Sequence, residues 1–186
     1  VVCAESTHSS VDSAARVMDV EVIRAELNPE HRLTGNSVAA AIDRRPDGTE
    51  VFAVVATAGT TNVGIVDDLN SIADACNGAG IWLHVDGAYG AGALVAPSVR
   101  DRFNGIERCD SLVVDPHKWL LSPFDCAALV YRDPTPARLT HTQHAGYLNS
   151  VIDDSVYNPS DHAHVLTRRA RGVPFWFSLA VHGTDA

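Results

Sequence analysis

Short apolar runs alternate with amphipathic stretches along the chain. Five of these runs are rich in Val, Ile and Ala and are little interrupted by polar residues, which is typical of strands buried in a parallel sheet. They cover residues 20–24, 51–57, 81–86, 111–114 and 126–131. The opening Val1-Val2-Cys3 reads like the middle of another strand, so we expect the chain to be a fragment of a longer protein.

Stretches with helical character lie between the apolar runs. Three of them follow residues that commonly cap helices, namely Ser9 or Ser10, Thr34, and Asp67 or Asp68. Gly78 and Gly80 would end the third helix, and Pro174 suits the first turn of a last helix through residue 181. The β-α-β alternation predicts an α/β fold in which a mostly parallel sheet carries helices on both faces.

The alternation fails between residues 140 and 167. This stretch is polar, contains several His and two Tyr, and shows no clear period. It reads as a long loop, and long loops in compact domains are often functional.

Composition and charge narrow the class of protein. The chain has 186 residues, which fits one domain, and 46% of them are hydrophobic, which is enough to bury a core. The net charge is −9 and the largest basic group is Arg168, Arg169 and Arg171, so we expect no nucleic acid as a partner. No apolar run reaches the roughly 18 residues of a membrane span and no signal-peptide pattern is found, so we expect no membrane association.

The four cysteines, Cys3, Cys76, Cys109 and Cys126, are scattered along the chain. None of them forms a CxxC pair, which argues against a zinc or redox motif. Scattered cysteines also argue against a disulfide framework, so we expect reduced thiols in a cytoplasmic protein and no bound metal.

The segment with the sharpest chemical signal is DPHKWLLSPFDCAALVYR, residues 115–132. Lys118 follows an apolar run and lies between His117 and Trp119. A single Lys is usually a solvated surface charge, but a surface lysine rarely has neighbours of this kind. A partly desolvated Lys has a lowered pKa, so that its neutral amine can attack an aldehyde.

The second segment is IWLHVDGAYGAG, residues 81–92, in which Asp86 ends an apolar run. Ligands normally bind at the carboxyl ends of parallel strands, and a buried Asp needs a positive partner or several donors. The small residues after Asp86 would let a flat ring approach the backbone; they are Gly87, Ala88, Gly90 and Gly92. The competing interpretation is an Asp that caps a helix or a turn.

Two further segments carry weaker signals. ATAGTTNVGIVDDL, residues 56–69, reads as a strand end, a polar turn and a helix start, and its glycines and hydroxyls could bind a polar ligand. ESTHSSVDSA, residues 5–14, places His8 at a strand-to-helix turn. A His in a loop is more often structural than functional.

Taken together and in this order, the four segments resemble the group II pyridoxal-phosphate-dependent decarboxylases, and most closely the aromatic-L-amino-acid decarboxylase branch. The resemblance rests on THSS, ATAGTT, HVDGAY, and HKW followed by FDC, and it covers essentially the whole chain. It implies a fold of the aspartate-aminotransferase type (fold type I), with residues 1–186 as the central part of the cofactor-binding large domain. It also implies pyridoxal 5'-phosphate as cofactor and decarboxylation of an amino acid, with aromatic amino acids favoured as substrates.

The resemblance also assigns individual roles around the cofactor ring. Lys118 looks like the lysine that forms the Schiff base, and Asp86 looks like the carboxylate that faces the pyridine nitrogen. His8 looks like the imidazole stacked on the ring, with Ala88 on the opposite face. Thr57 looks like a pocket threonine near the ring substituents.

Two more roles come from the resemblance. His117 lies beside the lysine in the family's phosphate-side segment. Tyr147 matches the family's catalytic tyrosine, carried by a mobile loop that we place over residues 140–167. Because that loop reaches into the partner subunit's site in the family, the resemblance implies a homodimer.

The sequence departs from the family at a few points. Position 115 is Asp where many animal members have Asn, and a carboxylate near a phosphate is unfavourable, so Asp115 is left out of the ligand set. The resemblance places the family's main phosphate-binding segment upstream of Val1, and we expect the family's small C-terminal domain to be missing from this fragment. Two alternatives stay open: an oxidative-deaminating aldehyde synthase on the same scaffold, in which Phe replaces the loop tyrosine, and a non-catalytic truncated remnant.

Overall fold

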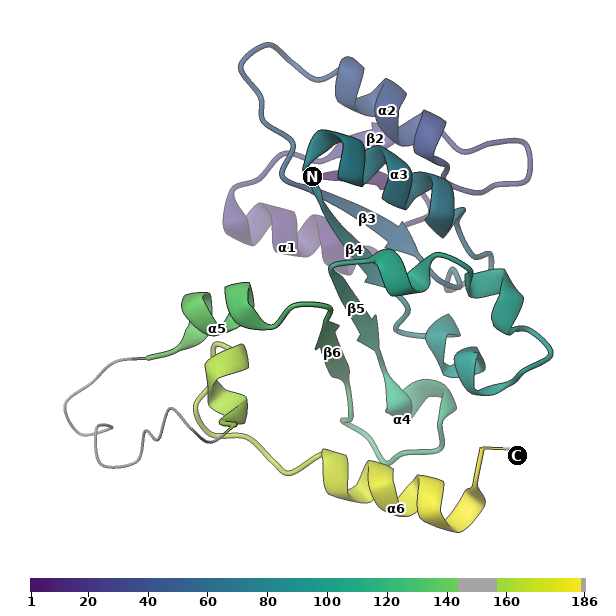
Figure 1. Cartoon of the computed structure of the whole chain (residues 1–186), viewed down its shortest axis with the longest axis vertical. Helices are drawn as coiled ribbons and strands as arrows, with labels where there is room; N and C mark the ends of the chain where they lie inside the picture. The colour runs from purple at the N-terminus through teal and green to yellow at the C-terminus, as the bar shows by residue number, and fades with distance from the viewer. Residues whose placement is uncertain (144–156, 185–186) are drawn as a thin grey trace.

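A six-stranded sheet forms the centre of the computed structural model, which describes residues 1–143 and 157–184 (Figure 1). The strands are β1 Val2–Ala4, β2 Ile23–Ala25, β3 Ala53–Thr57, β4 Trp82–Asp86, β5 Ser111–Val114 and β6 Ala128–Tyr131. Their spatial order is β2-β1-β3-β4-β5-β6, and all neighbouring pairs are parallel except β5 and β6. The predicted mostly parallel sheet is therefore confirmed.

The prediction of a buried parallel strand over residues 126–131 was wrong in direction and burial. β6 starts at Ala128, pairs antiparallel with β5, and leaves Leu129 and Val130 each 51% exposed at the edge of the sheet. Parallel pairing needs a crossover long enough to carry the chain back to the other end of the sheet. The segment after β5 contains only the four-residue helix α4, Pro116–Trp119, so the next strand starts from the same end and runs in the opposite direction.

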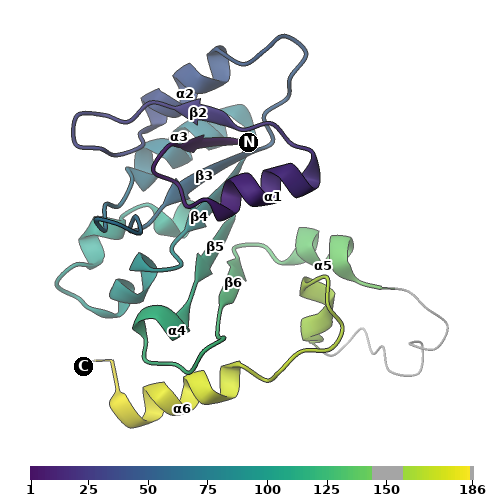
Figure 2. The same ribbon diagram turned by 180° about the vertical axis from the view of Figure 1, so that it is seen from behind.

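Helices cover both faces of the sheet, as expected. They are α1 Ser10–Met18, α2 Gly35–Asp43, α3 Leu69–Ala79, α4 Pro116–Trp119, α5 Thr135–His141 and α6 Gly172–His182, with short 3-10 turns at η1 Gly90–Val95, η2 Arg100–Phe103, η3 Ile106–Arg108 and η4 Pro159–His162. In Figure 1, α2 and α3 lie in front of the sheet, whereas α1 lies on the face that comes forward in Figure 2.

The helix ends follow local capping chemistry. The side chain of Thr34 accepts a hydrogen bond from Ser37 N at the start of α2, and that of Asp68 accepts one from Ser71 N at the start of α3. Gly80 ends α3 in the left-handed conformation. Ser9 is the N-cap residue of α1, but its side chain makes no cap hydrogen bond.

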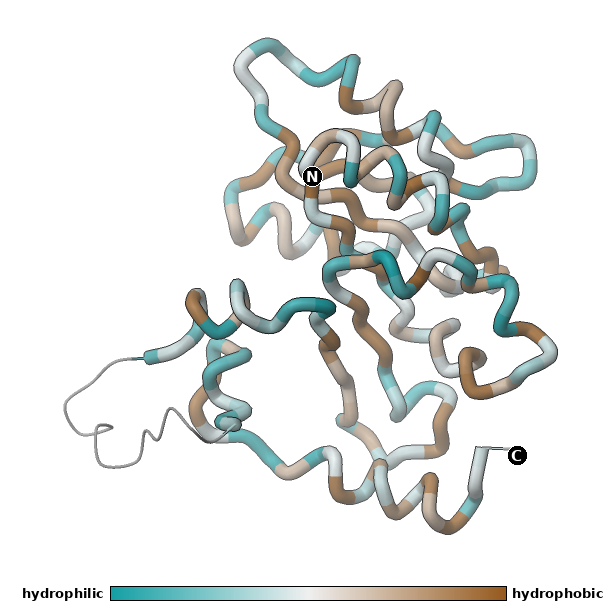
Figure 3. Tube along the Cα trace, viewed as in Figure 1, coloured by the Kyte–Doolittle hydropathy of each residue, from teal (hydrophilic) through white to brown (hydrophobic). Residues whose placement is uncertain are grey.

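The core lies between the sheet and the α2–α3 layer, where much of the tube in Figure 3 is brown, the colour of hydrophobic residues. Alternate side chains of β3 and β4 point into it, and they are fully or almost fully buried: Val54, Ala56, Leu83 and Val85. Because successive strand residues face opposite sides, the intervening Thr57, His84 and Asp86 lie on the other face. This second face carries the polar side chains described below.

Three other expectations concern the remainder of the chain. The region expected to be one long loop, 140–167, begins within α5 and includes η4 in its described part. All four cysteines are free and buried, and burial raises the pKa of Cys76 and of Cys109 to about 11. Within residues 1–143 and 157–184, no helix has the length and apolar character needed to span a bilayer.

Candidate active site

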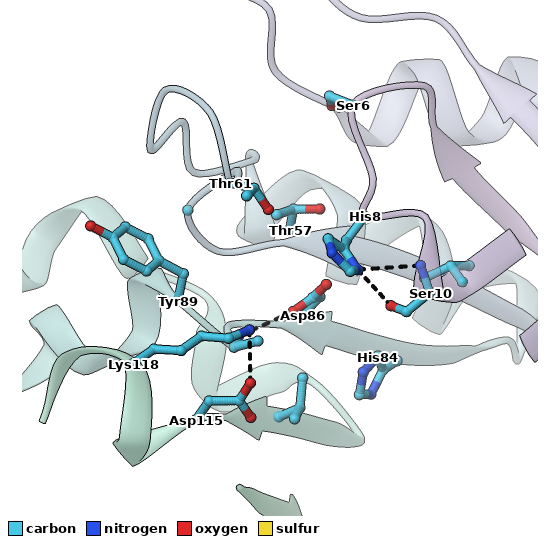
Figure 4. A pocket seen from close by; sticks show the side chains of 14 residues that line it. Ser6, His8, Ser10, Thr57, Thr61, His84, Asp86, Tyr89, Asp115 and Lys118 are labelled. Carbon is cyan, nitrogen blue, oxygen red and sulfur yellow. Dashed lines mark hydrogen bonds and ion pairs between the residues drawn. The ribbon is translucent and has the colours of Figure 1, made fainter. Parts of the chain in front are cut away.

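A pocket of about 340 Å³ opens where β3, β4 and β5 end (Figure 4). Five of the residues predicted from the sequence line it: His8, Thr57, Asp86, Ala88 and Lys118. Its volume lies within the roughly 300–1,000 Å³ usual for small-molecule sites, and its position at the carboxyl ends of parallel strands is where such folds bind ligands. Segments more than 100 residues apart along the chain thus meet in one place.

Strand register brings two of these side chains side by side. Thr57, the last residue of β3, pairs with Asp86, the last residue of β4, and Asp86 pairs in turn with Val113 of β5. The turn after β4 folds back so that the backbone N–H of Ala88 donates to Asp86 Oδ1 at 3.1 Å. One carboxylate oxygen is therefore held by the turn, and in the described part no hydrogen bond engages the other.

Lys118 reaches the pocket from α4. Its Nζ lies 2.8 Å from Oδ2 of Asp115, whose side chain is 12% exposed and also lines the pocket. The Lys118 side chain is 40% exposed, more than its apolar neighbours suggested, because Trp119 and Leu121 are themselves exposed. Asp115, which was left out of the predicted ligand set, is thus the ion-pair partner of the lysine.

The chain contains a single lysine. All the other Lys and Arg residues counted in its composition are arginines. A covalent bond between an aldehyde and a lysine of this chain can therefore form only at Lys118. This compositional fact is a signal that the sequence analysis did not use.

His8 enters the pocket from the turn before α1. The backbone N–H of Ser10 donates to His8 Nδ1 at 3.2 Å, and the Ser10 hydroxyl lies 2.9 Å from the same nitrogen. Since a backbone N–H can only donate, Nδ1 acts as an acceptor here and fixes the orientation of the ring. Arg24 supports the same segment, because it donates to Ala4 O at 2.9 Å and pairs with Asp12.

Thr57 presents an unpaired hydroxyl to the pocket. Its Oγ1 is buried and has no hydrogen-bond partner in the described part, whereas its backbone N–H donates to Asp67 Oδ2 at 2.7 Å. Buried polar atoms are normally paired, so an unpaired hydroxyl in a pocket indicates room for a polar ligand atom.

Two predicted residues are not brought into the pocket. The Nδ1 of His117 lies 2.5 Å from Cys126 O, and its ring packs edge-on against Phe124, so His117 faces the β6 side of α4. Its role near the cofactor stays a prediction. Tyr147 lies outside the described residues.

The pocket also contains residues that the sequence analysis missed. They include Ser6, Thr61, His84 and Tyr89. His84 could have been found, because it precedes Asp86 by two positions in a strand and therefore shares its face. Thr61 comes from the turn between β3 and α3, whose path no local pattern predicts.

The small residues after Asp86 were expected to line the pocket, and most of them do not. Of the four, only Ala88 lines the pocket. A Cβ atom on Gly90 would lie 2.2 Å from Ala58 O, and one on Gly87 would lie 2.5 Å from the Ala91 side chain. These glycines let backbone and neighbouring side chains pack closely, which is the role that the structure shows for them.

The whole chain, residues 1–186, matches the pyridoxal-dependent decarboxylase conserved domain, and the chain therefore belongs to this family. It is 36% identical to an aromatic-L-amino-acid decarboxylase of Bacillus atrophaeus over 98% of its own length and 39% of that protein. The chain thus spans about two fifths of the length of such relatives.

Solved structures show the same fold. A crystal structure of Oryza sativa TDC with PLP and tryptamine superposes with a TM-score of 0.89 at 28% identity, covering 98% of this chain and 39% of that one. A Rhodiola rosea 4-hydroxyphenylacetaldehyde synthase superposes with a TM-score of 0.80 at 26% identity, covering 99% and 38%. The fold is therefore that of the fold type I pyridoxal-dependent decarboxylases, as the sequence predicted.

The pocket residues fit pyridoxal phosphate. Its aldehyde requires an amine, which Lys118 offers, and its ring nitrogen requires a carboxylate, which Asp86 offers. The unpaired Oγ1 of Thr57 can bond a polar substituent of the ring. The phosphate group is negatively charged, and the acidic Asp115 is unfavourable beside it. The described pocket residues therefore meet only part of the cofactor's requirements.

Proposed function

We propose that the protein is a pyridoxal-phosphate-dependent decarboxylase that converts an L-amino acid to the amine and CO2. The observation that carries this proposal is the convergence of Lys118 and Asp86, with His8 beside them, on one pocket in a chain of this family (Figure 4). The relatives cited above favour an aromatic amino acid as substrate.

Each residue of the pocket has a specific task in this proposal. Bound pyridoxal phosphate supplies an electron sink for the electron pair left behind when CO2 departs. Lys118 would hold the cofactor covalently, and its amine would be displaced by the amino group of the substrate. Asp86 pairs with the ring nitrogen through a charge-assisted hydrogen bond.

The remaining residues orient the ring and deliver the final proton. His8 would stack on one face of the ring, and Ala88 would limit the opposite face. The Thr57 hydroxyl bonds a ring substituent. We assign to Tyr147 the protonation of the substrate carbon after CO2 leaves, a step to which a general acid typically contributes about 10²–10⁴-fold.

The attachment point is tested by changing Lys118. In the full-length enzyme, Lys118→Ala should abolish the covalent cofactor label that borohydride reduction leaves on the protein, as read by mass spectrometry. Lys118→Arg is the matched control: it keeps a cation beside Asp115 yet cannot form the bond, so it should also remain unlabelled. A label on either variant would mean that a lysine outside this chain holds the cofactor.

The substrate and the reaction type are tested together. A panel of aromatic and acidic L-amino acids should release CO2 and yield the amine, with the aromatic members reacting fastest. A second candidate function is the oxidative-deaminating aldehyde synthase activity, favoured by the similarity to the Rhodiola rosea enzyme. Ammonia, peroxide and aldehyde in place of the amine would establish that alternative.

We further propose that the full-length enzyme is a homodimer. The helix α6 supports this, because it leaves large apolar side chains exposed: Val173, Trp176, Phe177 and Val181. Exposed apolar patches often mark interaction sites. Light scattering should give twice the mass of one chain, and Trp176→Glu should shift the mass toward one chain, whereas Val17→Glu on α1 should not. A parent enzyme that stays monomeric at micromolar concentration contradicts the proposal.

A further inference from the structure

His84 lies in the pocket and has no task in the function proposed above. It belongs to β4 and precedes Asp86 by two residues, so both side chains lie on the same face of the sheet (Figure 4). The proposed chemistry requires that Asp86 face the cofactor nitrogen. The imidazole of His84 lies beside Asp86 in the pocket.

The imidazole is fixed from the neighbouring strand. His84 pairs in register with Ser111 of β5, and its Nδ1 lies 2.8 Å from Ser111 Oγ. Ser111 is only 5% exposed, and its Oγ accepts a second hydrogen bond from Trp82 Nε1 at 2.9 Å. Three side chains on one face of the sheet thus form a connected polar chain.

The direction of the hydrogen bonds in this chain follows from the groups involved. An indole N–H can only donate, so Ser111 Oγ accepts from Trp82. In the described part, the other hydrogen bond of Ser111 Oγ is the one to His84, so the hydroxyl proton is available for Nδ1. Because Ser111 is buried and its hydroxyl proton needs an acceptor, donation to Nδ1 is the favoured arrangement, and it favours the imidazole proton on Nε2, away from Ser111.

The charge state agrees with this assignment. Burial lowers the pKa of His84, and the Asp86 carboxylate opposes part of that effect. The other charged or titratable side chains that line the pocket are those of His8, Tyr89, Asp115 and Lys118. At neutral pH the imidazole is therefore uncharged, and Asp86 is close enough for the two groups to interact electrostatically.

We propose that His84 is a positioning residue for Asp86: Ser111 and Trp82 lock its ring, and the locked ring holds the Asp86 carboxylate with its second oxygen directed at the cofactor nitrogen. The other oxygen is already held by Ala88 N. This inference rests on the proposed function, because it concerns the carboxylate that serves the cofactor.

The test uses the full-length enzyme loaded with pyridoxal phosphate that is ¹⁵N-labelled at the ring nitrogen. The ¹⁵N chemical shift reports protonation and hydrogen bonding of that nitrogen independently of turnover. We expect Ser111→Ala and His84→Leu to move this signal toward that of an unprotonated pyridine. We also expect them to lower kcat about 10-fold with KM changed less than about twofold, as is typical for the loss of a supporting hydrogen bond.

Two further variants separate positioning from a merely structural role. His84→Gln keeps a polar N–H donor and should restore part of the shift and of kcat relative to His84→Leu. Ser71→Ala makes the same change as Ser111→Ala on the opposite face of the sheet, in α3, and should leave the ¹⁵N signal at the parent position.

The outcomes distinguish this inference from the proposed function. If the parent enzyme binds the cofactor and decarboxylates while both Ser111→Ala and His84→Leu keep its ¹⁵N signal and kcat, His84 does not position Asp86. If the parent itself shows no bound-cofactor signal, the proposed function fails. Should His84→Leu not fold, the comparison of Ser111→Ala with Ser71→Ala decides the matter.

Discussion

At the scale of single residues, the fold places a carboxylate and an amine in one pocket and gives each its own partner. Asp86 is held through Ala88 N, whereas Lys118 is paired with Asp115 and not with Asp86. Because Asp115 engages the lysine, Asp86 keeps one oxygen for a ligand. The two groups can therefore serve opposite ends of the same cofactor.

This arrangement predicts the effect of Asp86→Asn. The amide can still accept the hydrogen bond of Ala88 N, so the fold should persist, but it cannot stabilise a protonated ring nitrogen. We expect turnover to fall by roughly 100-fold or more, equivalent to about 3 kcal/mol of lost transition-state stabilisation. Stopped-flow or steady-state assays of CO2 release measure this loss.

The control for Asp86→Asn is Asp74→Asn, which makes the same change at a carboxylate on α3 that is 72% exposed and paired with Arg108. Exposed pairs contribute little, so this variant should keep the parent's turnover. Normal turnover of Asp86→Asn at normal cofactor content would refute the role given to Asp86.

At the scale of elements, the turn between β3 and α3 is closed by one buried carboxylate. Asp67 is 2% exposed; its Oδ1 accepts from Leu33 N and its Oδ2 from Thr57 N, at 2.8 and 2.7 Å. Its backbone N–H also donates to Thr57 O. The residue expected as a possible cap of α3 instead fixes the turn that carries Thr61 to the pocket, while Asp68 caps the helix.

Asp67 gives this turn a pH dependence of definite sign. Burial raises the pKa of Asp67 to about 6, although both backbone N–H donors and Arg32 favour the carboxylate. Between about pH 4 and pH 6 the folded state therefore binds more protons than the unfolded chain. The contribution of this group to the free energy of unfolding then decreases as the pH rises, by up to roughly 3 kcal/mol.

The variant Asp67→Asn removes this titration. We expect the stability of the parent minus that of the variant, measured by urea unfolding, to be larger at pH 4 than at pH 7 by up to roughly 3 kcal/mol. Asp68→Asn, in which an amide still caps α3, should stay within about 0.5 kcal/mol of the parent at pH 7. Parallel stability curves for the parent and Asp67→Asn over this range would show that Asp67 does not titrate there.

At the scale of the whole molecule, the proposed function assigns the final proton transfer to the segment over residues 140–167. Tyr147 lies within it, outside the described residues, and its role rests on the proposed function. Tyr147→Phe removes the acid but keeps the bulk of the ring. The electron-rich carbon left by CO2 should then react with oxygen.

We therefore expect Tyr147→Phe to release CO2 while losing amine formation, with aldehyde, ammonia and peroxide appearing in aerobic buffer. Under nitrogen the same variant should form little aldehyde, which is the control for the oxygen step. Amine formation at the parent rate would show that the proton comes from another group. Loss of CO2 release would show that Tyr147 acts before the carbon–carbon bond breaks.

The sequence by itself determined the features that depend on local physics. The predicted cap at Thr34, and the one at Asp67 or Asp68, depend on contacts within one helical turn, and the strands were predicted from short runs rich in Val, Ile and Ala. Asp86 was predicted as a site residue because a buried carboxylate at a strand end is costly without a partner. Lys118 was predicted because its neighbours are apolar and because the HKW segment resembles the family, and both residues line the pocket.

Only the tertiary structure decided the features that depend on register and chain path. The short α4 does not carry the chain back to the other end of the sheet, and this decides the direction of β6. The register of β4 and β5 decides the pairing of His84 with Ser111. The turn of His117 toward Cys126 depends on β6 lying beside α4. The two hydrogen bonds of Asp67 join segments up to 34 residues apart. Such contacts form between residues distant in sequence, so no local pattern of apolar and polar positions encodes them.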